Sequence, residues 1–204
     1  MKTSLRIFCL FLVIILASAL ASCGDNAPKL DEVKENFIYL IEESRELNHI
    51  FFGMGLPVYR RDDAITERKT VYFIDDLTGY DRIMEQSKYV SIDEIKAAAE
   101  QVYSEDYLSA LYESAFDGIL VGDTGAYLRF YDDGEWLYQN ANATDFGLSE
   151  RIFDYSTMEI IKPSTQDYVN VEIECYSLAD RNRVTYTLSF ILEDGEWRLD
   201  SPTY

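Results

Sequence analysis

The spacing of apolar residues changes from a helical to a strand period near Ala126, and this change constrains the fold more than any other feature. Between residues 30 and 52, apolar side chains recur every three or four residues, which predicts one amphipathic helix that Gly53 and Gly55 end. From Ala126 onward they recur every second residue, which predicts strands. This order predicts an α+β fold, in which a long N-terminal helix and a helix pair pack on one face of a curved antiparallel sheet.

The helix pair has explicit start signals. Ser91 and Glu94 form a capping-box pattern, in which each side chain accepts a hydrogen bond from a free backbone N–H. Ser104 resembles a second cap, so we expect the chain to bend there and to continue as a helix over 105–116.

Tight turns separate the predicted strands. Asp133-Gly134 and Asp194-Gly195 are hairpin signals, and we interpret the pentapeptides around them, DDGEW and EDGEW, as the same turn used twice. Residues 140–155 are predicted to be a polar connection. The predicted strands cover residues 70–74, 126–131, 136–138, 157–161, 168–178, 184–192 and 197–199.

The first 22 residues have the order of a secretory signal. Lys2 and Arg6 precede an apolar run over 7–16, which is too short to span a bilayer but suits a signal-peptide core. Small residues then lead to Cys23, and the sequence Leu-Ala-Ser-Cys resembles the lipobox of bacterial lipoproteins. We therefore expect lipidation of Cys23. The alternatives are an ordinary signal peptide with a chance cysteine at the cut, or an uncleaved anchor.

This interpretation divides the chain into a lipoprotein signal peptide over 1–22, a lipidated tether over 23–29 and one α+β domain over 30–204. Removal of the signal takes away two cations, so the net charge falls from −19 to −21. We expect a location on the extracytoplasmic face of the cell membrane, held by the lipid anchor. Such a charge disfavours nucleic acid and favours a partner protein with a basic surface.

The cysteines permit no internal disulfide in the mature chain. Cys9 leaves with the signal and Cys23 is expected to be acylated, so Cys175 remains alone. It stands in the alternating row of Val169, Val171 and Ile173, which favours a buried, small apolar role over a reactive thiol.

The residues that usually carry catalysis are scarce. His49, the sole histidine, falls away from the apolar stripe of its helix, and no metal-binding, nucleophile-elbow or phosphate-loop spacing occurs. Adjacent acids such as Asp132-Asp133 are expected in solvated turns. We predict no enzyme, cofactor or metal, and keep a catalytic carboxylate hidden in a pocket as an alternative.

Tyrosine is abundant, with 16 in the chain. Its large ring and polar tip suit recognition as well as packing, and both roles remain open here. The candidates outside periodic stretches are Tyr59, Tyr80, Tyr89, Tyr155 and Tyr204.

Three segments together resemble one family. They are the long helix running into residues 51–58 (FFGMGLPV), the helix pair over 91–116, and the ending over 195–204 (GEWRLDSPTY). In these segments the chain is similar to the IseA family of DL-endopeptidase inhibitors. The resemblance implies a cystatin-like or nuclear-transport-factor-like fold and a protein that plugs the catalytic groove of NlpC-type peptidoglycan hydrolases.

We therefore predict a membrane-anchored binding or inhibitory module of the cell envelope, which is not an enzyme. Its alternative is an envelope lipoprotein that binds a small molecule between helix and sheet. The predicted partner-binding loop is the long connection after the first helix. Its residues are Gly53, Met54, Gly55, Leu56, Pro57, Val58, Tyr59, Arg60 and Arg61.

Overall fold

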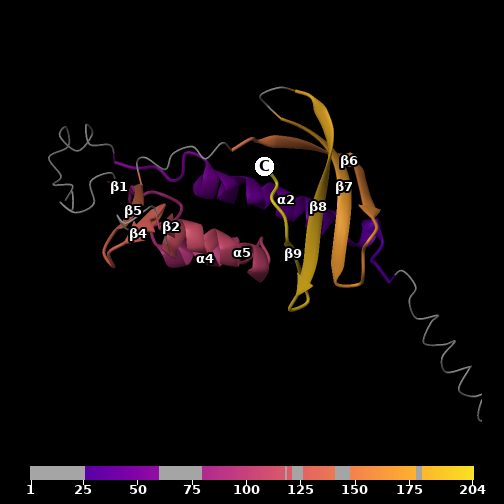
Figure 1. Cartoon of the computed structure of the whole chain (residues 1–204), viewed down its shortest axis with the longest axis horizontal. Coiled ribbons are helices and arrows are strands. Elements are labelled where there is room, and N and C mark those ends of the chain that lie inside the picture. Colours follow the sequence, from indigo (N-terminus) through magenta and orange to yellow (C-terminus); the bar gives the residue numbers. More distant parts are fainter. Residues whose placement is uncertain (1–25, 60–79, 118, 121–125, 141–147, 178–180) are drawn as a thin grey trace, which may run out of the picture.

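The computed structural model describes residues 26–59, 80–117, 119–120, 126–140, 148–177 and 181–204 (Figure 1). A long first helix and one short strand come first, then two α-helices and a short π-helix in succession, and then the remaining strands. The elements are α2 (Leu30–Phe52), β1 (Tyr80–Arg82), α4 (Ile92–Ala99), α5 (Glu105–Tyr112), η1 (Glu113–Asp117), β2 (Ile119–Leu120), β3 (Ala126–Tyr127), β4 (Phe130–Asp132), β5 (Leu137–Asn140), β6 (Arg151–Ile161), β7 (Tyr168–Ser177), β8 (Arg183–Glu193) and β9 (Glu196–Leu199).

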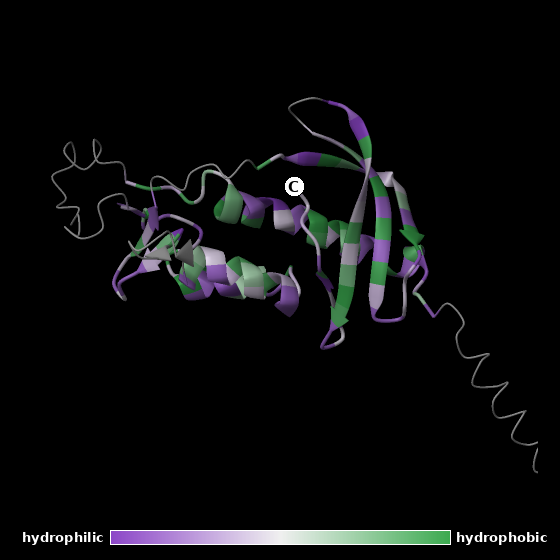
Figure 2. Cartoon of the chain, in the orientation of Figure 1, coloured by the Kyte–Doolittle hydropathy of each residue, from purple (hydrophilic) through white to green (hydrophobic). Residues whose placement is uncertain are grey.

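The α+β prediction is confirmed by a four-stranded antiparallel sheet with the first half of α2 packed across it. The strand order is β6-β7-β8-β9 (Figure 1). Residues alternate in hydropathy along β7 (Figure 2), and its apolar face is buried, including Cys175 at 1% exposure. The expected burial of this thiol is thus confirmed. Phe37 of α2 stacks on Phe190 of β8, with 3.9 Å between ring centroids and 7° between planes.

Not all strands join that sheet. β1, β5 and β4 form a separate three-stranded sheet near the C-terminal end of α2, and β2 pairs with β3 (Figure 1). The predicted strand over 126–131 is interrupted, because residues 126–127 pair with β2 whereas residues 130–132 pair with β5. The helix pair lies beside α2. Phe116, in the π-helix η1 that continues α5, meets Phe51 edge-on with 6.0 Å between ring centroids.

Both predicted helix starts are confirmed. Ser91 accepts the backbone N–H of Glu94, and the Glu94 carboxylate accepts the backbone N–H of Val90 at 2.8 Å. Ser104 caps α5 by accepting the backbone N–H of Tyr107 at 3.1 Å. The first helix has the predicted bounds, Leu30–Phe52.

The prediction of a polar connection over 140–155 is wrong, because β6 begins at Arg151. The pairing of β6 with β7 shifts register between Asp154 and Glu159. This irregularity places the buried side chains Phe153 and Met158 five residues apart, an odd spacing that an alternating pattern cannot produce.

The two similar pentapeptides form different turns, so their interpretation as one repeated turn is also wrong. In the second, Glu193 pairs with Glu196 and both central residues have positive φ, Asp194 at 52° and Gly195 at 85°, which is a type I′ turn. In the first, the last ladder pair is Asp132 with Leu137, so a loop of four residues, 133–136, joins the strands. There the Asp133 carboxylate accepts the backbone N–H groups of residues 135 and 136.

Candidate functional site

The predicted partner-binding loop is described from Gly53 to Tyr59. Arg60 and Arg61 lie outside the described residues, and so does Cys23, the expected lipidation site. Val58 forms an isolated antiparallel bridge with Ile83, and the backbone N–H of Met84 donates to Pro57 O at 2.9 Å. The loop therefore extends the three-stranded sheet at the β1 edge.

Two buried polar side chains hold this loop to the end of α2. Arg129, 3% exposed, donates from Nε to Ile50 O and from a terminal guanidinium nitrogen to Gly53 O, both at 2.6 Å. Gln139, also 3% exposed, accepts the backbone N–H of Leu56 at 2.7 Å and donates to Met54 O at 2.8 Å. These contacts satisfy carbonyl groups that a helix C-terminus otherwise leaves free.

The loop presents one large apolar side chain to solvent, Met54, which is 65% exposed. Leu56 is buried, and the Tyr59 hydroxyl donates to the Glu85 carboxylate. Among the described loop residues, the contact available to a partner is therefore small and centred on Met54.

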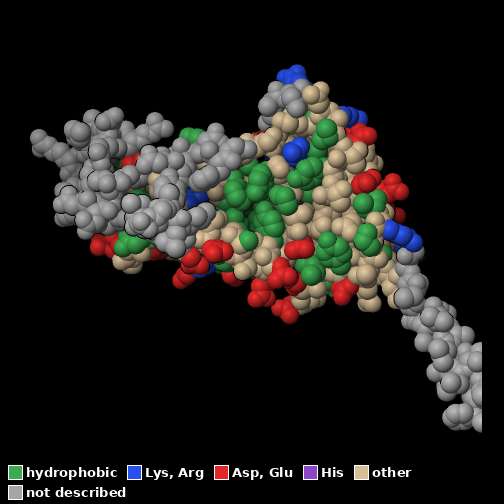
Figure 3. All heavy atoms as spheres, viewed as in Figure 1, with side chains coloured by type: hydrophobic (Ala, Val, Ile, Leu, Met, Phe, Trp, Pro, Cys, Tyr) green, Lys and Arg blue, Asp and Glu red, His purple; other side chains and the backbone are tan. Residues whose placement is uncertain are grey.

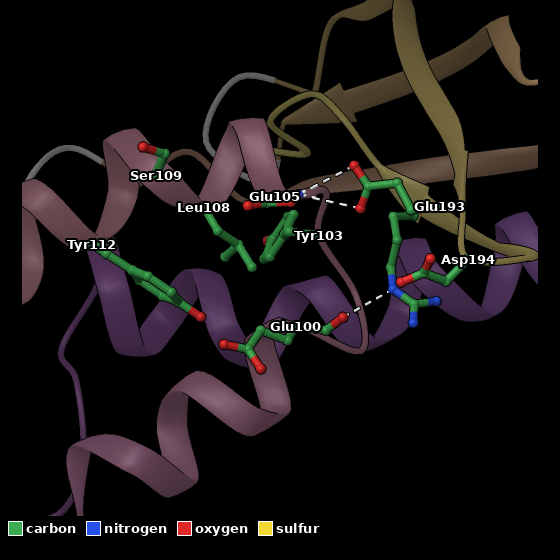
Figure 4. A pocket seen from close by; sticks show the side chains of 9 residues that line it. Glu100, Tyr103, Glu105, Leu108, Ser109, Tyr112, Glu193 and Asp194 are labelled. Atoms are coloured by element: carbon green, nitrogen blue, oxygen red, sulfur yellow. Dashed lines mark hydrogen bonds between the residues drawn. The ribbon is translucent and has the colours of Figure 1, made fainter.

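A larger concave feature lies between α5 and the β8–β9 turn (Figure 4). This acidic cleft encloses about 550 Å³. Four carboxylates and one guanidinium line it, over a wall of tyrosine and leucine. The lining residues are Glu100, Tyr103, Glu105, Leu108, Ser109, Tyr112, Glu193, Asp194 and Arg198.

Hydrogen bonds fix the mouth of the acidic cleft. The Glu193 carboxylate accepts the backbone N–H of Glu105 at 3.2 and 3.3 Å, so the β8–β9 turn closes onto the first turn of α5 (Figure 4). Arg198 donates from Nε to Glu100 O at 2.9 Å and forms an ion pair with Glu196 at 2.8 Å. Because Arg198 is already paired, the cleft keeps a marked excess of negative charge.

The space-filling view shows the same asymmetry on a larger scale. Acidic side chains gather along the edge formed by the helix pair and the β8–β9 turn (Figure 3). Hydrophobic side chains gather on this face above them, near the end of the C-terminal segment (Figure 3).

The tyrosines predicted for loops have mixed positions. Tyr80 and Tyr155 lie in β1 and β6, so they were wrongly placed outside regular structure. Tyr89 and Tyr155 pack against the core, and the Tyr80 hydroxyl donates to Leu128 O at 2.6 Å. Tyr204 lines a second, apolar groove beside α5.

The sole histidine and two of the aspartates have structural partners. His49 lies in the last turn of α2, and its Nε2 is 2.7 Å from a Glu150 carboxylate oxygen. The pKa of Asp154 lies below its ordinary value, because Ser156 donates to it from its hydroxyl at 2.6 Å and from its backbone N–H at 3.2 Å. Desolvation acts to raise the pKa of Asp133, but hydrogen bonds from Trp136 and from residue 135 outweigh it and lower that pKa. A general acid requires the opposite shift.

Within the described ranges, no group of three histidine, cysteine, aspartate or glutamate side chains is arranged to hold a metal ion. No helix in the same ranges has the length and apolarity that crossing a bilayer requires.

The acidic cleft was not predicted from the sequence. Its carboxylates come from the residue after α4, from the start of α5 and from a turn more than 80 residues later, and each looks like an ordinary solvated acid in the sequence. Tertiary contacts bring them together, among them the hydrogen bond between Glu193 and the start of α5 and the one between Arg198 and Glu100 O. No protein-family model matches the chain, and no curated protein matches it.

Proposed function

We propose that this protein is an extracytoplasmic lipoprotein that binds a basic partner protein and, in doing so, restrains it. The partner class we propose is the NlpC-type peptidoglycan DL-endopeptidase. Lipidation at Cys23 would hold the protein at the outer face of the cell membrane, where such hydrolases act. The proposal joins the resemblance to the IseA family with the charge and shape of the described residues.

The observation that carries the proposal is the acidic cleft in a chain of net charge −19. Four of its nine lining residues are carboxylates, and its one cation is paired with Glu196. A field of one sign accelerates the encounter with an oppositely charged surface and disfavours like-charged partners. Hydrolases that must reach anionic wall polymers are expected to carry positive charge, so they suit this cleft.

The alternative of a small-molecule carrier required a pocket between α2 and the sheet. Aromatic rings fill that space: Phe37 stacks on Phe190 and meets Trp197 at 89°, with 5.3 Å between centroids. Phe37 and Phe190 are both 0% exposed. The described clefts flank α5 instead, at the surface, where a protein partner has access.

The experiment is a pull-down of envelope proteins with the protein purified from a host that expresses the full chain, followed by assays of the captured hydrolases on muropeptides. We expect capture of a basic protein that weakens as salt rises from about 0.05 to 0.5 M. Glu100→Lys should weaken capture several-fold, on the order of what one opposed charge costs. Glu43→Lys makes the same charge change at an exposed position of α2 outside the cleft.

The two variants separate cleft binding from nonspecific attraction. If both weaken capture equally, net charge alone is responsible and the cleft is not the site. If hydrolase rates stay unchanged in excess protein, for each NlpC-type enzyme of the host, inhibition is excluded.

A further inference from the structure

A second concave feature lies on the other side of α5 from the acidic cleft. This aromatic groove encloses about 510 Å³ between the end of α2, α5 and the C-terminal segment. Three aromatic rings and two aliphatic side chains form it, with polar groups at its rim. The lining residues are Phe52, Asp106, Tyr107, Ala110, Leu111, Ser114, Asp200 and Tyr204.

The rings of the groove pack on one another and are partly open to solvent. Tyr204 and Phe52 lie with 4.5 Å between centroids at 34°. Tyr107 stacks on the buried Tyr103, with 4.8 Å between centroids at 27°. Phe52, Tyr107 and Tyr204 are each half-buried, so each has a face or edge that a further apolar group can cover.

A buried hydrogen-bond network holds the C-terminal wall of the groove in place. Thr203, 4% exposed, accepts from Asn48 Nδ2 at 2.7 Å and shares a 2.6 Å hydrogen bond with the Ser44 hydroxyl. The Tyr103 hydroxyl donates to Asn48 Oδ1 at 2.8 Å. The Tyr186 hydroxyl donates to Tyr204 O at 3.3 Å. The groove is therefore already formed, which lowers the cost of ordering on binding.

Carboxylates stand beside the aromatic surface. Asp106 is exposed at the rim, and Asp200 accepts the Ser104 hydroxyl at 2.5 Å. Asp106 directly follows Glu105, which lines the acidic cleft, so negative charge continues around the first turn of α5. This charge disfavours a second copy of the same acidic chain as occupant, and favours a cationic one.

We infer that the aromatic groove receives an apolar side chain of a partner segment that carries a lysine or arginine next to it. The apolar group covers the Phe52, Tyr107 and Tyr204 rings, and the neighbouring cation lies against Asp106. Buried aromatic contacts of this kind usually supply most of the affinity of an interface. The inference rests on the proposed function and adds to it the chemistry of the partner segment.

The probes are three capped peptides, Gly-Lys-Trp-Lys-Gly, Gly-Lys-Ala-Lys-Gly and Gly-Glu-Trp-Glu-Gly, titrated into the ¹⁵N-labelled protein from a host expressing the full chain. We expect the first peptide to shift amide signals over residues 106–114 and 200–204. The peptide without tryptophan and the peptide with glutamates should each bind about tenfold more weakly.

The matched variants are Ala110→Arg in the groove and Ala97→Arg on α4, which change charge equally at exposed helix positions. A cation introduced four residues after Asp106 is expected to pair with it and lie across the groove without destabilising α5. Ala110→Arg should weaken binding of the first peptide about tenfold, and Ala97→Arg less than about twofold.

Each outcome decides the matter. Three results would overturn the inference. The first is equal binding of the first peptide by both variants, and the second is amide shifts confined to other residues. The third is a groove occupied only by a second copy of the chain as the protein concentration rises. If the wild type captures a hydrolase and Ala110→Arg captures it equally well, the inference about the groove is overturned and the proposed function is not. Peptide binding in the groove without capture of any envelope protein overturns the proposed function and leaves the groove as a peptide site.

Discussion

The two halves of α2 differ in the side chains that they bury. The first half packs on the four-stranded sheet through apolar contacts: Val33, Phe37, Leu40 and Ile41 are buried there, and Phe37 stacks on Phe190. The second half buries apolar side chains as well, but it also carries polar side chains inward. Ser44 and Asn48, 0% and 4% exposed, bond to Thr203 of the C-terminal segment.

The difference teaches how stability and position are divided in this fold. The stabilisation from apolar burial is roughly proportional to the buried area and does not depend on direction. It therefore holds the helix and the sheet together without fixing the exact position of a segment. Hydrogen bonds are directional and costly to leave unmade in the interior. They fix the C-terminal segment, which forms one wall of the aromatic groove, and they fix the loop after α2.

The largest effect is expected in the apolar half. Phe37→Ala removes a fully buried ring that contacts both Phe190 and Trp197, and should lower the free energy of unfolding by about 3–5 kcal/mol. Urea denaturation measures this loss. Tyr39→Ala, at a side chain that is 55% exposed on the same helix, serves as the control and should cost far less. Equal losses would mean that α2 is not anchored by this stack.

The next effect tests the loop at the other end of α2. Gly55 has φ 78°, and a Cβ there would lie 1.9 Å from Gln139 Oε1, which accepts the Leu56 N–H. Gly195 has φ 85°, but a Cβ there meets nothing within 4 Å. Backbone strain should make Gly195→Ala cost about 1–2 kcal/mol. Gly55→Ala should cost about 1–3 kcal/mol more, because it also disrupts buried hydrogen bonds.

Urea denaturation of the two alanine variants gives this difference directly. Similar losses for both would show that Gln139 can move aside, and that the loop is held less firmly than its contacts indicate.

A smaller effect is expected in the polar network. Thr203→Val keeps the shape of the side chain but leaves the buried Asn48 amide without its acceptor, so it should cost about 1–3 kcal/mol. Thr187→Val makes the same change at an exposed position of β8 and should be nearly neutral. Amide exchange should quicken in residues 200–204 of the first variant before it changes in the sheet. Unchanged exchange there would contradict the role given to the network.

The smallest effect is a pH dependence confined to alkaline solution. Burial is the largest cause raising the pKa of Tyr103, Tyr107 and Tyr112. Burial and the neighbouring Asp133 carboxylate together raise the pKa of Tyr138 to about 12. Tyrosine in the unfolded chain ionises near pH 10. The unfolded state therefore releases these protons first, and the stability they contribute is full below about pH 10 and lost as pH rises through 12.

Denaturation in urea at intervals from pH 8 to 12 follows this loss. Tyr138→Phe should show a shallower decline than the wild type, since one raised pKa is gone. An identical decline would mean that ionisation of Tyr138 does not contribute to it.

The sequence predicted the elements governed by local signals. The bounds of α2 follow from its apolar period and the glycines after it, and the caps at Ser91 and Ser104 follow from side-chain chemistry next to the helix. The start of β6 was missed because the irregularity after Asp154 breaks the alternation. The division into separate sheets depends on which strands meet, and no local pattern specifies that.

The candidate sites were less predictable than the fold. Glu105 and Glu193 meet only through the tertiary structure, as do Tyr107 and Tyr204. The two pentapeptide turns are a further example of structure that the local sequence does not determine. Their similar sequences form turns of different length because the flanking strands pair differently.

If the chain is tethered to a membrane before Leu30, the length of α2 limits how far from that tether the loop after α2 can lie. A helix of 23 residues extends about 35 Å at 1.5 Å per residue. With a lipid on Cys23, the short segment before the helix would keep Leu30 close to the bilayer surface. Depending on the tilt of this rod, Met54 and the loop after α2 would then reach as far as one helix length into the envelope. The anchor would thus limit how far from the bilayer the loop after α2 can contact a partner, and a change in the length of α2 would change that distance.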